Sequence, residues 1–311
     1  MVTYSKTPTK NNTDLADINE LLVGLFLNNG KWFDSAAKSQ HDSKQKKLTE
    51  FQYVDQKEKA SVMATGFVQW AKANGYSGIV KKVFWTARPN VITRIVGYNV
   101  DQRKNPTDIL IEFTRGPANG FIGMSAKSTN TNRDITFKNL GIGTIEKKLK
   151  IKLSDIVDNA TGVLIRKFKL SKTGSARTNE IRRSPEIKKF ANKLGSESLM
   201  AMRNRTLVKM NTMTQDQLYN YIVEDWMDAS KIMSPYIKVT GMGKAPPYKA
   251  KVEDPLKNDK MSNMSKGVIK MMRVGNDSIG IKAKGKRVMK IRFKFQNEKL
   301  ASSAVALGEP W

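Results

Sequence analysis

Two short apolar runs on either side of a turn-forming segment place the strongest constraint on how this chain folds. The runs cover residues 108–113 and 121–125, and the segment between them, TRGPANG, combines glycine, proline and asparagine. Glycine tolerates positive φ and proline fixes φ near the value that tight turns require. The pattern therefore predicts a β-hairpin at residues 108–125.

The two ends of this hairpin carry opposite charges. Side chains alternate between the faces of a strand, so Asp108 shares a face with Glu112, and Ser125 shares a face with Lys127. Asp108 begins the first run and Lys127 follows the second. Pairing of the strands is therefore expected to bring this carboxylate and this ammonium together at the open end of the hairpin.

Helical patterns precede the hairpin. Residues 14–28 follow Thr13, a suitable N-cap, and repeat apolar side chains at helical spacing, as do residues 57–74. The polar segment 34–47 contains the sole histidine, His41, which we expect in a solvated loop. Residues 79–86 are rich in strand-forming residues, so helices and strands together predict an α/β core with a central mixed sheet flanked by helices.

The second half of the chain has a different pattern. Helical signals appear at 139–152 and 196–230, and short strand-like pieces follow residue 267. We therefore expect residues 1–160 to form the core. Residues 161–311 are expected to form a basic linker or arm, a helical segment and a β-rich region, a C-terminal α+β extension packed on that core.

The charge balance of the chain indicates a polyanionic partner. Its 311 residues include 55 Lys and Arg but only 28 Asp and Glu, a formal net charge of +27. Contacts between cationic side chains and phosphates release condensed counterions, which favours binding to nucleic acid. No apolar run reaches the length of a membrane span, no secretory signal is visible and cysteine is absent. A cytoplasmic protein without a membrane partner is expected, in the host-cell cytoplasm if the chain is phage-encoded.

The densest basic run extends over residues 166–193, where only Glu180 and Glu186 are acidic. Such a run either forms a solvated charged face or contacts phosphates. Residues 286–295 also alternate apolar and basic side chains, which fits a strand beside a nucleic acid or any half-exposed strand. The candidate nucleic-acid contacts in the basic run are Arg166, Lys167, Lys169, Lys172, Arg177, Arg182 and Arg183.

The hairpin with its flanking residues resembles the PD-(D/E)xK nuclease superfamily. Pro106-Thr107-Asp108 corresponds to the Pro-Asp element with a threonine inserted, and Ser125-Ala126-Lys127 corresponds to the (D/E)xK element with serine in the acidic position. The chain looks most similar to phage-encoded members with a serine there. The resemblance covers residues 14–150 and implies a restriction-endonuclease-like core and an Mg²⁺-dependent phosphodiester hydrolase.

The resemblance also implies roles for individual residues. Asp108, the Ala126 carbonyl and Glu20 on the preceding helix would hold Mg²⁺, for which Mn²⁺ could substitute. Lys127 would position or deprotonate the attacking water and stabilise developing charge. Ser125 occupies the catalytic position that is normally acidic, so one carboxylate is missing. Glu20 would then supply it, with Glu112 and Glu146 as the other candidates.

The sequence leaves the function open between two classes. The first is a metal-dependent DNA nuclease, including a structure-selective enzyme such as a junction resolvase. The second is a non-catalytic nucleic-acid-binding or packaging protein, which explains the charge equally well. DNA versus RNA, endonuclease versus exonuclease action and the existence of a homodimer stay open.

Overall fold

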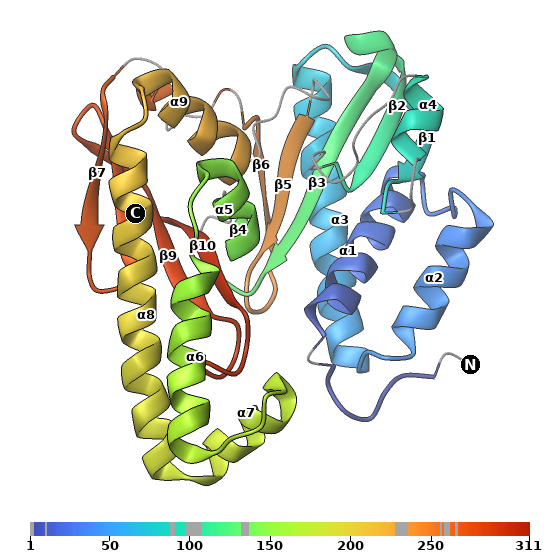
Figure 1. Ribbon diagram of the computed structural model, residues 1–311. Helices are drawn as coiled ribbons and strands as arrows, with labels where there is room; N and C mark the ends of the chain where they lie inside the picture. Colours follow the sequence, from blue (N-terminus) through green and yellow to red (C-terminus); the bar gives the residue numbers. More distant parts are fainter. Residues whose placement is uncertain are drawn as a thin grey trace. The chain divides into compact units, whose positions relative to one another are not determined.

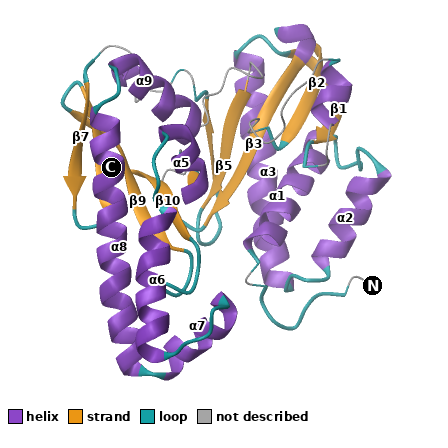
Figure 2. Cartoon of the chain, viewed as in Figure 1, coloured by secondary structure: helices purple, strands orange, loops and turns teal. Residues whose placement is uncertain are grey.

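The computed structural model divides the chain into two compact units (Figure 1). Unit 1 comprises Met1–Ile135 and Ala229–Asn258, and unit 2 comprises Thr136–Asp228 and Asp259–Trp311. Each unit contains one β-sheet and helices (Figure 2). The structure describes residues 3–9, 11–87, 91–97, 107–131, 137–227, 236–255, 257, 262–264 and 267–311.

Unit 1 begins with helices and continues into strands, as the sequence predicts. Its described helices are α1 (Asn12–Leu27), α2 (Ser35–Gln45), α3 (Glu50–Ala73), α4 (Val91–Val96) and the short 3₁₀ helix η2 (Ala118–Gly120). Its described strands are β1 (Ser77–Trp85), β2 (Ile109–Arg115), β3 (Phe121–Thr129), β5 (Tyr236–Met242) and β6 (Lys249–Glu253).

The sheet of unit 1 is mixed, which confirms the predicted α/β class. Its strand order is β1-β2-β3-β5-β6. Strands β3 and β5 run parallel, whereas the other neighbours pair antiparallel. Apolar residues of α1 and α3 pack with residues of β2, β3 and β5 in one core. A smaller cluster around Ile92 of α4 and Leu110 of β2 lies on the other face of β2.

The predicted hairpin is formed by β2 and β3. Ile109 pairs with Met124, and Glu112 pairs with Phe121. The turn needs glycine at position 120, where φ is +81° and a Cβ would lie 2.3 Å from the Phe113 carbonyl oxygen. Local sequence therefore specifies both the strands and the connection between them.

Unit 2 combines an antiparallel sheet with a group of helices. The sheet has the order β4-β10-β9-β8-β7, and α8 packs against β7, β8 and β9 while α6 packs against α8. The described strands are β4 (Asn139–Gly141), β7 (Ile269–Val274), β8 (Ser278–Ala283), β9 (Lys286–Phe295) and β10 (Ala304–Pro310). The described helices are α5 (Ile142–Leu149), α6 (Ser154–Phe168), α7 (Gly174–Arg183), α8 (Pro185–Asn211), α9 (Gln215–Asn220) and the π-helical turn η3 (Tyr221–Trp226).

The division into units differs from the expected boundary at residue 160. The sheet of unit 1 is completed by β5 and β6, which come from the second half of the chain. Strand β4 near residue 140 pairs instead with β10 of unit 2. The cause is the pairing of strands that lie far apart in the chain, which local sequence patterns do not reveal.

Segment 34–47 is helical rather than a solvated loop. Asp34 caps α2, because its side chain accepts a hydrogen bond from the backbone N–H of Ala37. His41 is buried, with its ring 4.7 Å from that of Trp32 and its Nε2 3.1 Å from the Tyr53 hydroxyl. Burial lowers the pKa of His41. The expectation of an exposed His41 is therefore wrong, because aromatic neighbours from other segments cover it.

Two helix starts also differ from expectation. Helix α1 is capped by Asn11, whose side chain accepts from the backbone N–H of Thr13, so Thr13 itself is not the cap. Helix α3 begins at Glu50, because Thr49 and Gln52 form a capping box there. Among the described residues, no helix is long and apolar enough to cross a bilayer.

Candidate active site

The candidate site lies just before the first residue of β2, where β3 continues with β5 as its neighbour. Asp108 immediately precedes β2. Its backbone N–H donates to the Met124 carbonyl at 2.9 Å, and its own carbonyl accepts from the Thr86 N–H at 3.0 Å. These two bonds join Asp108 to β3 on one side and to the end of β1 on the other. The backbone of Asp108 is therefore held rigidly at the point where the strands part.

Three donors from β3 converge on the Asp108 carboxylate. Its Oδ2 accepts hydrogen bonds from Ser125 Oγ at 3.0 Å, the Ala126 N–H at 2.9 Å and Lys127 Nζ at 3.0 Å. The side chains of Lys127 and Asp108 remain 37% and 21% exposed, so the pair is open to solvent. The structure thus brings together Asp108, Ser125, Ala126 and Lys127, all of which were singled out from sequence.

Glu20 of α1 belongs to the same group. It is buried, and its Oε2 accepts a hydrogen bond from Trp85 Nε1 at 2.9 Å. Burial, together with the nearby negative charge of Asp108, raises the pKa of Glu20 to about 8, against the opposing effects of Trp85 and Lys127. Glu20 and Asp108 are therefore close enough to repel each other, and a proton on Glu20 relieves the repulsion near neutral pH.

The Ala126 carbonyl is directed toward the same place. Peptide groups two residues apart on a strand point to the same side. The Met124 carbonyl faces β2, where it accepts from the Asp108 N–H. The Ala126 carbonyl therefore points past the start of β2, on the side where its own N–H reaches Asp108. This oxygen lies on the side of β3 where Asp108 is held.

The donor set suits a hard divalent cation. Mg²⁺ in proteins takes oxygen ligands, usually one or two carboxylates together with waters and substrate phosphate. Glu20 and Asp108 supply two carboxylates, and Ala126 supplies a neutral oxygen. Over the described part of the chain, three or more acidic, histidine or cysteine side chains do not gather at any one point. Ser125 acts as a hydrogen-bond donor to Asp108, so it does not replace the missing acid.

The two other acids considered from sequence lie elsewhere. Glu112 forms an ion pair with Lys81, with an Oε1–Nζ distance of 2.6 Å. Glu146 belongs to unit 2, where its Oε1 accepts from the backbone N–H groups of Leu153 and Ser154 and so caps the start of α6. Of the three acids considered from sequence, Glu20 alone lies beside Asp108 among the described residues. The Pro106 element of the motif lies outside the described residues.

Strand β5 adds two side chains that sequence reasoning missed. Lys238 pairs in register with Ser125, and Thr240 pairs with Lys127. Both are buried, and alternation places them on the sheet face that Ser125 and Lys127 occupy. The alternating pattern of YIKVT was the available signal. Its position next to the hairpin could not be read from it, because about a hundred residues separate the two strands in sequence.

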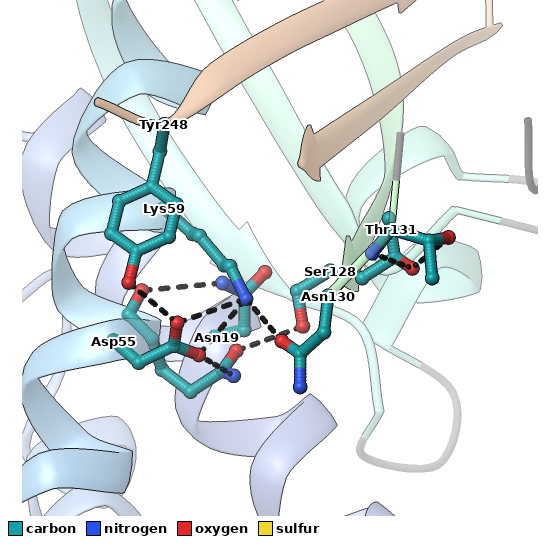
Figure 3. A network of polar contacts seen from close by, with 9 residues as sticks. Asn19, Asp55, Lys59, Ser128, Asn130, Thr131 and Tyr248 are labelled. Carbon is teal, nitrogen blue, oxygen red and sulfur yellow. Dashed lines mark hydrogen bonds and ion pairs between the residues drawn. The ribbon is translucent and has the colours of Figure 1, made fainter. Parts of the chain in front are cut away.

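On the opposite face of β3, a second polar network surrounds Lys59 of α3 (Figure 3). Lys59 is fully buried, and its Nζ lies 3.0 Å from Asp55 and 2.6 Å from Asn130 Oδ1. The Tyr248 ring centroid is 5.2 Å from the same Nζ, and the Tyr248 hydroxyl donates to Asp55 at 2.8 Å. The ammonium is therefore surrounded by partners that balance its burial.

This network continues to β3 and α1. Ser128 Oγ donates to Gln56 Oε1 at 2.8 Å, and Asn19 Nδ2 donates to the Gln56 carbonyl at 3.3 Å. Ser128 follows Lys127 on β3, and Asn19 precedes Glu20 on α1. The network thus anchors both elements of the candidate site one residue away from its charged groups.

The basic run of unit 2 is only partly available for binding. Arg177 is buried and donates to the carbonyls of Leu300, Ser171 and Lys172, so it holds loops together instead of facing a partner. Burial lowers its pKa. Arg182 bonds to Glu298 and Asn297, and Lys167 Nζ lies 4.0 Å from the centroid of the Phe190 ring. Among the residues that the structure describes, the exposed members of the predicted set without such a contact are Arg166, Lys169, Lys172 and Arg183.

Comparison with known proteins adds no family to this description. Neither a protein-family model nor a curated protein sequence matches the chain. The class that the fold defines is an α/β protein with a mixed sheet and an additional antiparallel sheet. Any more particular conclusion rests on the chemistry of the grouped side chains.

Proposed function

We propose that this protein is a metal-dependent nuclease that hydrolyses phosphodiester bonds in DNA, built on a restriction-endonuclease-like core. The observation that carries the proposal is the convergence of Glu20, Asp108 and Lys127 at the start of β2. These residues come from three separate elements, and two of them are carboxylates that repel each other. Paired acids with a strongly perturbed pKa are typical of functional sites.

A divalent cation suits this arrangement because it could take the place of the proton that the raised pKa leaves on Glu20 near neutral pH. Glu20, Asp108 and the Ala126 carbonyl would hold Mg²⁺. Bound there, the ion would acidify a water and offset charge on the phosphate. Because the ion must displace a proton from Glu20, its affinity is expected to rise with pH up to about 8.

The remaining residues act on the substrate and on the carboxylates. Lys127 is half-exposed and lies 3.0 Å from Asp108, where its ammonium can orient a water and stabilise developing negative charge. Ser125 and the Ala126 N–H hold Asp108 in one orientation. Trp85 holds Glu20. A pre-positioned set of this kind lowers the cost of bringing water and phosphate together.

The test is a cleavage assay with purified protein on plasmid, single-stranded and four-way-junction DNA, in Mg²⁺, Mn²⁺ or EDTA. Cleavage is expected with either ion and not with EDTA. Asp108→Ala and Lys127→Ala are each expected to lower the rate by about 10² to 10⁴ while DNA binding persists. Glu112→Gln is the matched control, because Glu112 lies on the same strand but pairs with Lys81.

The outcome separates the functions that the sequence left open. Cleavage that persists in both site variants would reject the assignment of the site. Binding without cleavage under any ion would favour the non-catalytic binding or packaging protein. Preference for the junction over linear DNA would identify a structure-selective nuclease.

A further inference from the structure

The sheet of unit 2 has one buried face and one basic face. Ile279, Ile281, Met289 and Ile291 are fully buried on the face that α8 covers. Lys282 follows Ile281 on β8 and therefore lies on the other face. That face is unusually rich in cations.

Register aligns three of these cations directly beside one another. Lys270 of β7 pairs with Lys282 of β8, and Lys282 pairs with Arg287 of β9. Adjacent strands lie about 4.8 Å apart. The three residues therefore form a row across three strands, which we call the cationic row.

The cationic row is unfavourable for folding by itself. Like charges directly opposite on neighbouring strands destabilise a sheet. No acid in the described part of the chain forms an ion pair with Lys270, Lys282 or Arg287. Farther along β9 the situation is different, because Glu309 binds both Lys290, at 3.0 Å, and Arg292, at 2.6 Å. In the described part of the chain, the cationic row has no comparable acidic partner.

Trp311 holds two members of the cationic row in place. A Cβ on Gly280 would lie 2.7 Å from the Trp311 ring, so the ring packs directly over this glycine. Lys282 Nζ is 5.6 Å and Arg287 Cζ is 5.0 Å from the ring centroid. Cation–π attraction of this kind favours a defined position for both charges.

A hollow adjoins the end of the cationic row. It has a volume of about 310 Å³ and is lined by Lys270, Lys282, Lys284 and the neighbouring residues Gly267, Val268 and Gly285. The stem of Lys284 packs against Gly267, where a Cβ would lie 2.4 Å from Lys284 Cγ. Three lysines thus line one hollow on this side of the sheet.

We propose that the cationic row, with Lys284 and the adjoining hollow, binds the phosphates of a nucleic-acid strand. The net charge of +27 favours a polyanion as partner, and successive phosphates would offset the repulsion along the row. The surface lies within unit 2 and its binding does not require the chemistry proposed for unit 1. Its contacts reach the backbone and are therefore independent of base sequence.

The test measures DNA binding by fluorescence anisotropy of a labelled oligonucleotide over a range of salt concentrations. The triple variant Lys270→Gln/Lys282→Gln/Arg287→Gln is expected to bind about 10-fold to 100-fold more weakly and to lower the salt slope by about 2 to 3. The matched control, Lys31→Gln/Lys57→Gln/Lys72→Gln, removes the same charge from exposed positions outside the basic run. An equal loss in both variants would overturn the proposal, because binding would then follow net charge alone.

Two further measurements complete the test. Trp311→Leu keeps every cation but releases Lys282 and Arg287, so affinity should fall about 3-fold with the salt slope unchanged. The triple variant should also be at least as thermally stable as the wild type, because repulsion between the three cations is removed.

Vesicles with anionic lipid serve as a competitor for the labelled DNA. Displacement of DNA by such vesicles and not by unlabelled DNA would reject nucleic acid as the partner. These binding measurements do not depend on cleavage, so they test the cationic row even if the proposed nuclease activity is not found.

Discussion

Two groups of carboxylates and lysines flank the end of β3 in unit 1, and they differ in how completely their charges are balanced. Around Lys59, every charged group has partners from several elements. Around Lys127, two carboxylates share one ammonium and the buried one is driven toward protonation. The Lys59 network balances its charges with its own side chains, whereas the Lys127 group balances them near neutral pH with a proton on Glu20.

The largest effect on stability is expected when the Lys59 network loses its lysine. Lys59→Met leaves Asp55 without its buried partner and should lower the free energy of unfolding by about 3–5 kcal/mol. Urea unfolding measures this loss. Lys57→Met, an exposed neighbour on α3, is the control and should change stability by less than about 0.5 kcal/mol. A loss below about 1 kcal/mol for Lys59→Met would show that the network is not structural.

Glu20→Gln should change how the stability of the protein depends on pH, because it removes the Glu20 carboxyl group that titrates. The folded pKa of Glu20 is raised from 4.5 to about 8, so the folded state holds a proton that the unfolded state releases. This contribution is complete below pH 4.5 and disappears as the pH rises through 8. In EDTA at pH 9, the free energy of unfolding of the variant should exceed that of the wild type by on the order of a few kcal/mol. Equal stability of the two proteins at pH 9 would mean that the pKa of Glu20 is not raised in the folded state.

Ser125→Ala should have a moderate effect. It removes one of three hydrogen bonds to Asp108 Oδ2 while the backbone of Ala126 and the Lys127 ammonium remain. Stability should fall by about 1–2 kcal/mol, and the cleavage rate should fall by about 10-fold because Asp108 becomes less fixed. Thermal unfolding and single-turnover cleavage measure the two effects. An unchanged rate would show that Ser125 does not orient the carboxylate.

Lys127→Met should change stability least. The Lys127–Asp108 pair is partly open to solvent, and such pairs contribute about 0–1 kcal/mol. The contrast with Lys59→Met under identical conditions tests whether the two groups differ as described. A loss comparable to that of Lys59→Met would place Lys127 in the structural framework and weaken its assignment to the reaction.

The local parts of the fold and of the site could be predicted from the sequence. The hairpin follows from alternation and from glycine at position 120, and it brings Asp108 and Lys127 together. Glu20 was placed near them on the basis of its helix and the family resemblance. Strand β5 was missed, because its parallel pairing with β3 joins residues such as Ser125 and Lys238 that lie far apart in the chain. The burial of His41 and Arg177 was missed for the same reason.

By itself, the sequence determined the hairpin, the first helix and the excess of positive charge, because alternation, helical spacing and composition act over short range. Only the tertiary structure decided which carboxylates lie close enough to interact, which cations are buried and which cations lie in a row. Burial and Coulomb interactions depend on distance in space. The raised pKa of Glu20 and the alignment of Lys270, Lys282 and Arg287 therefore arise only when distant segments pack together.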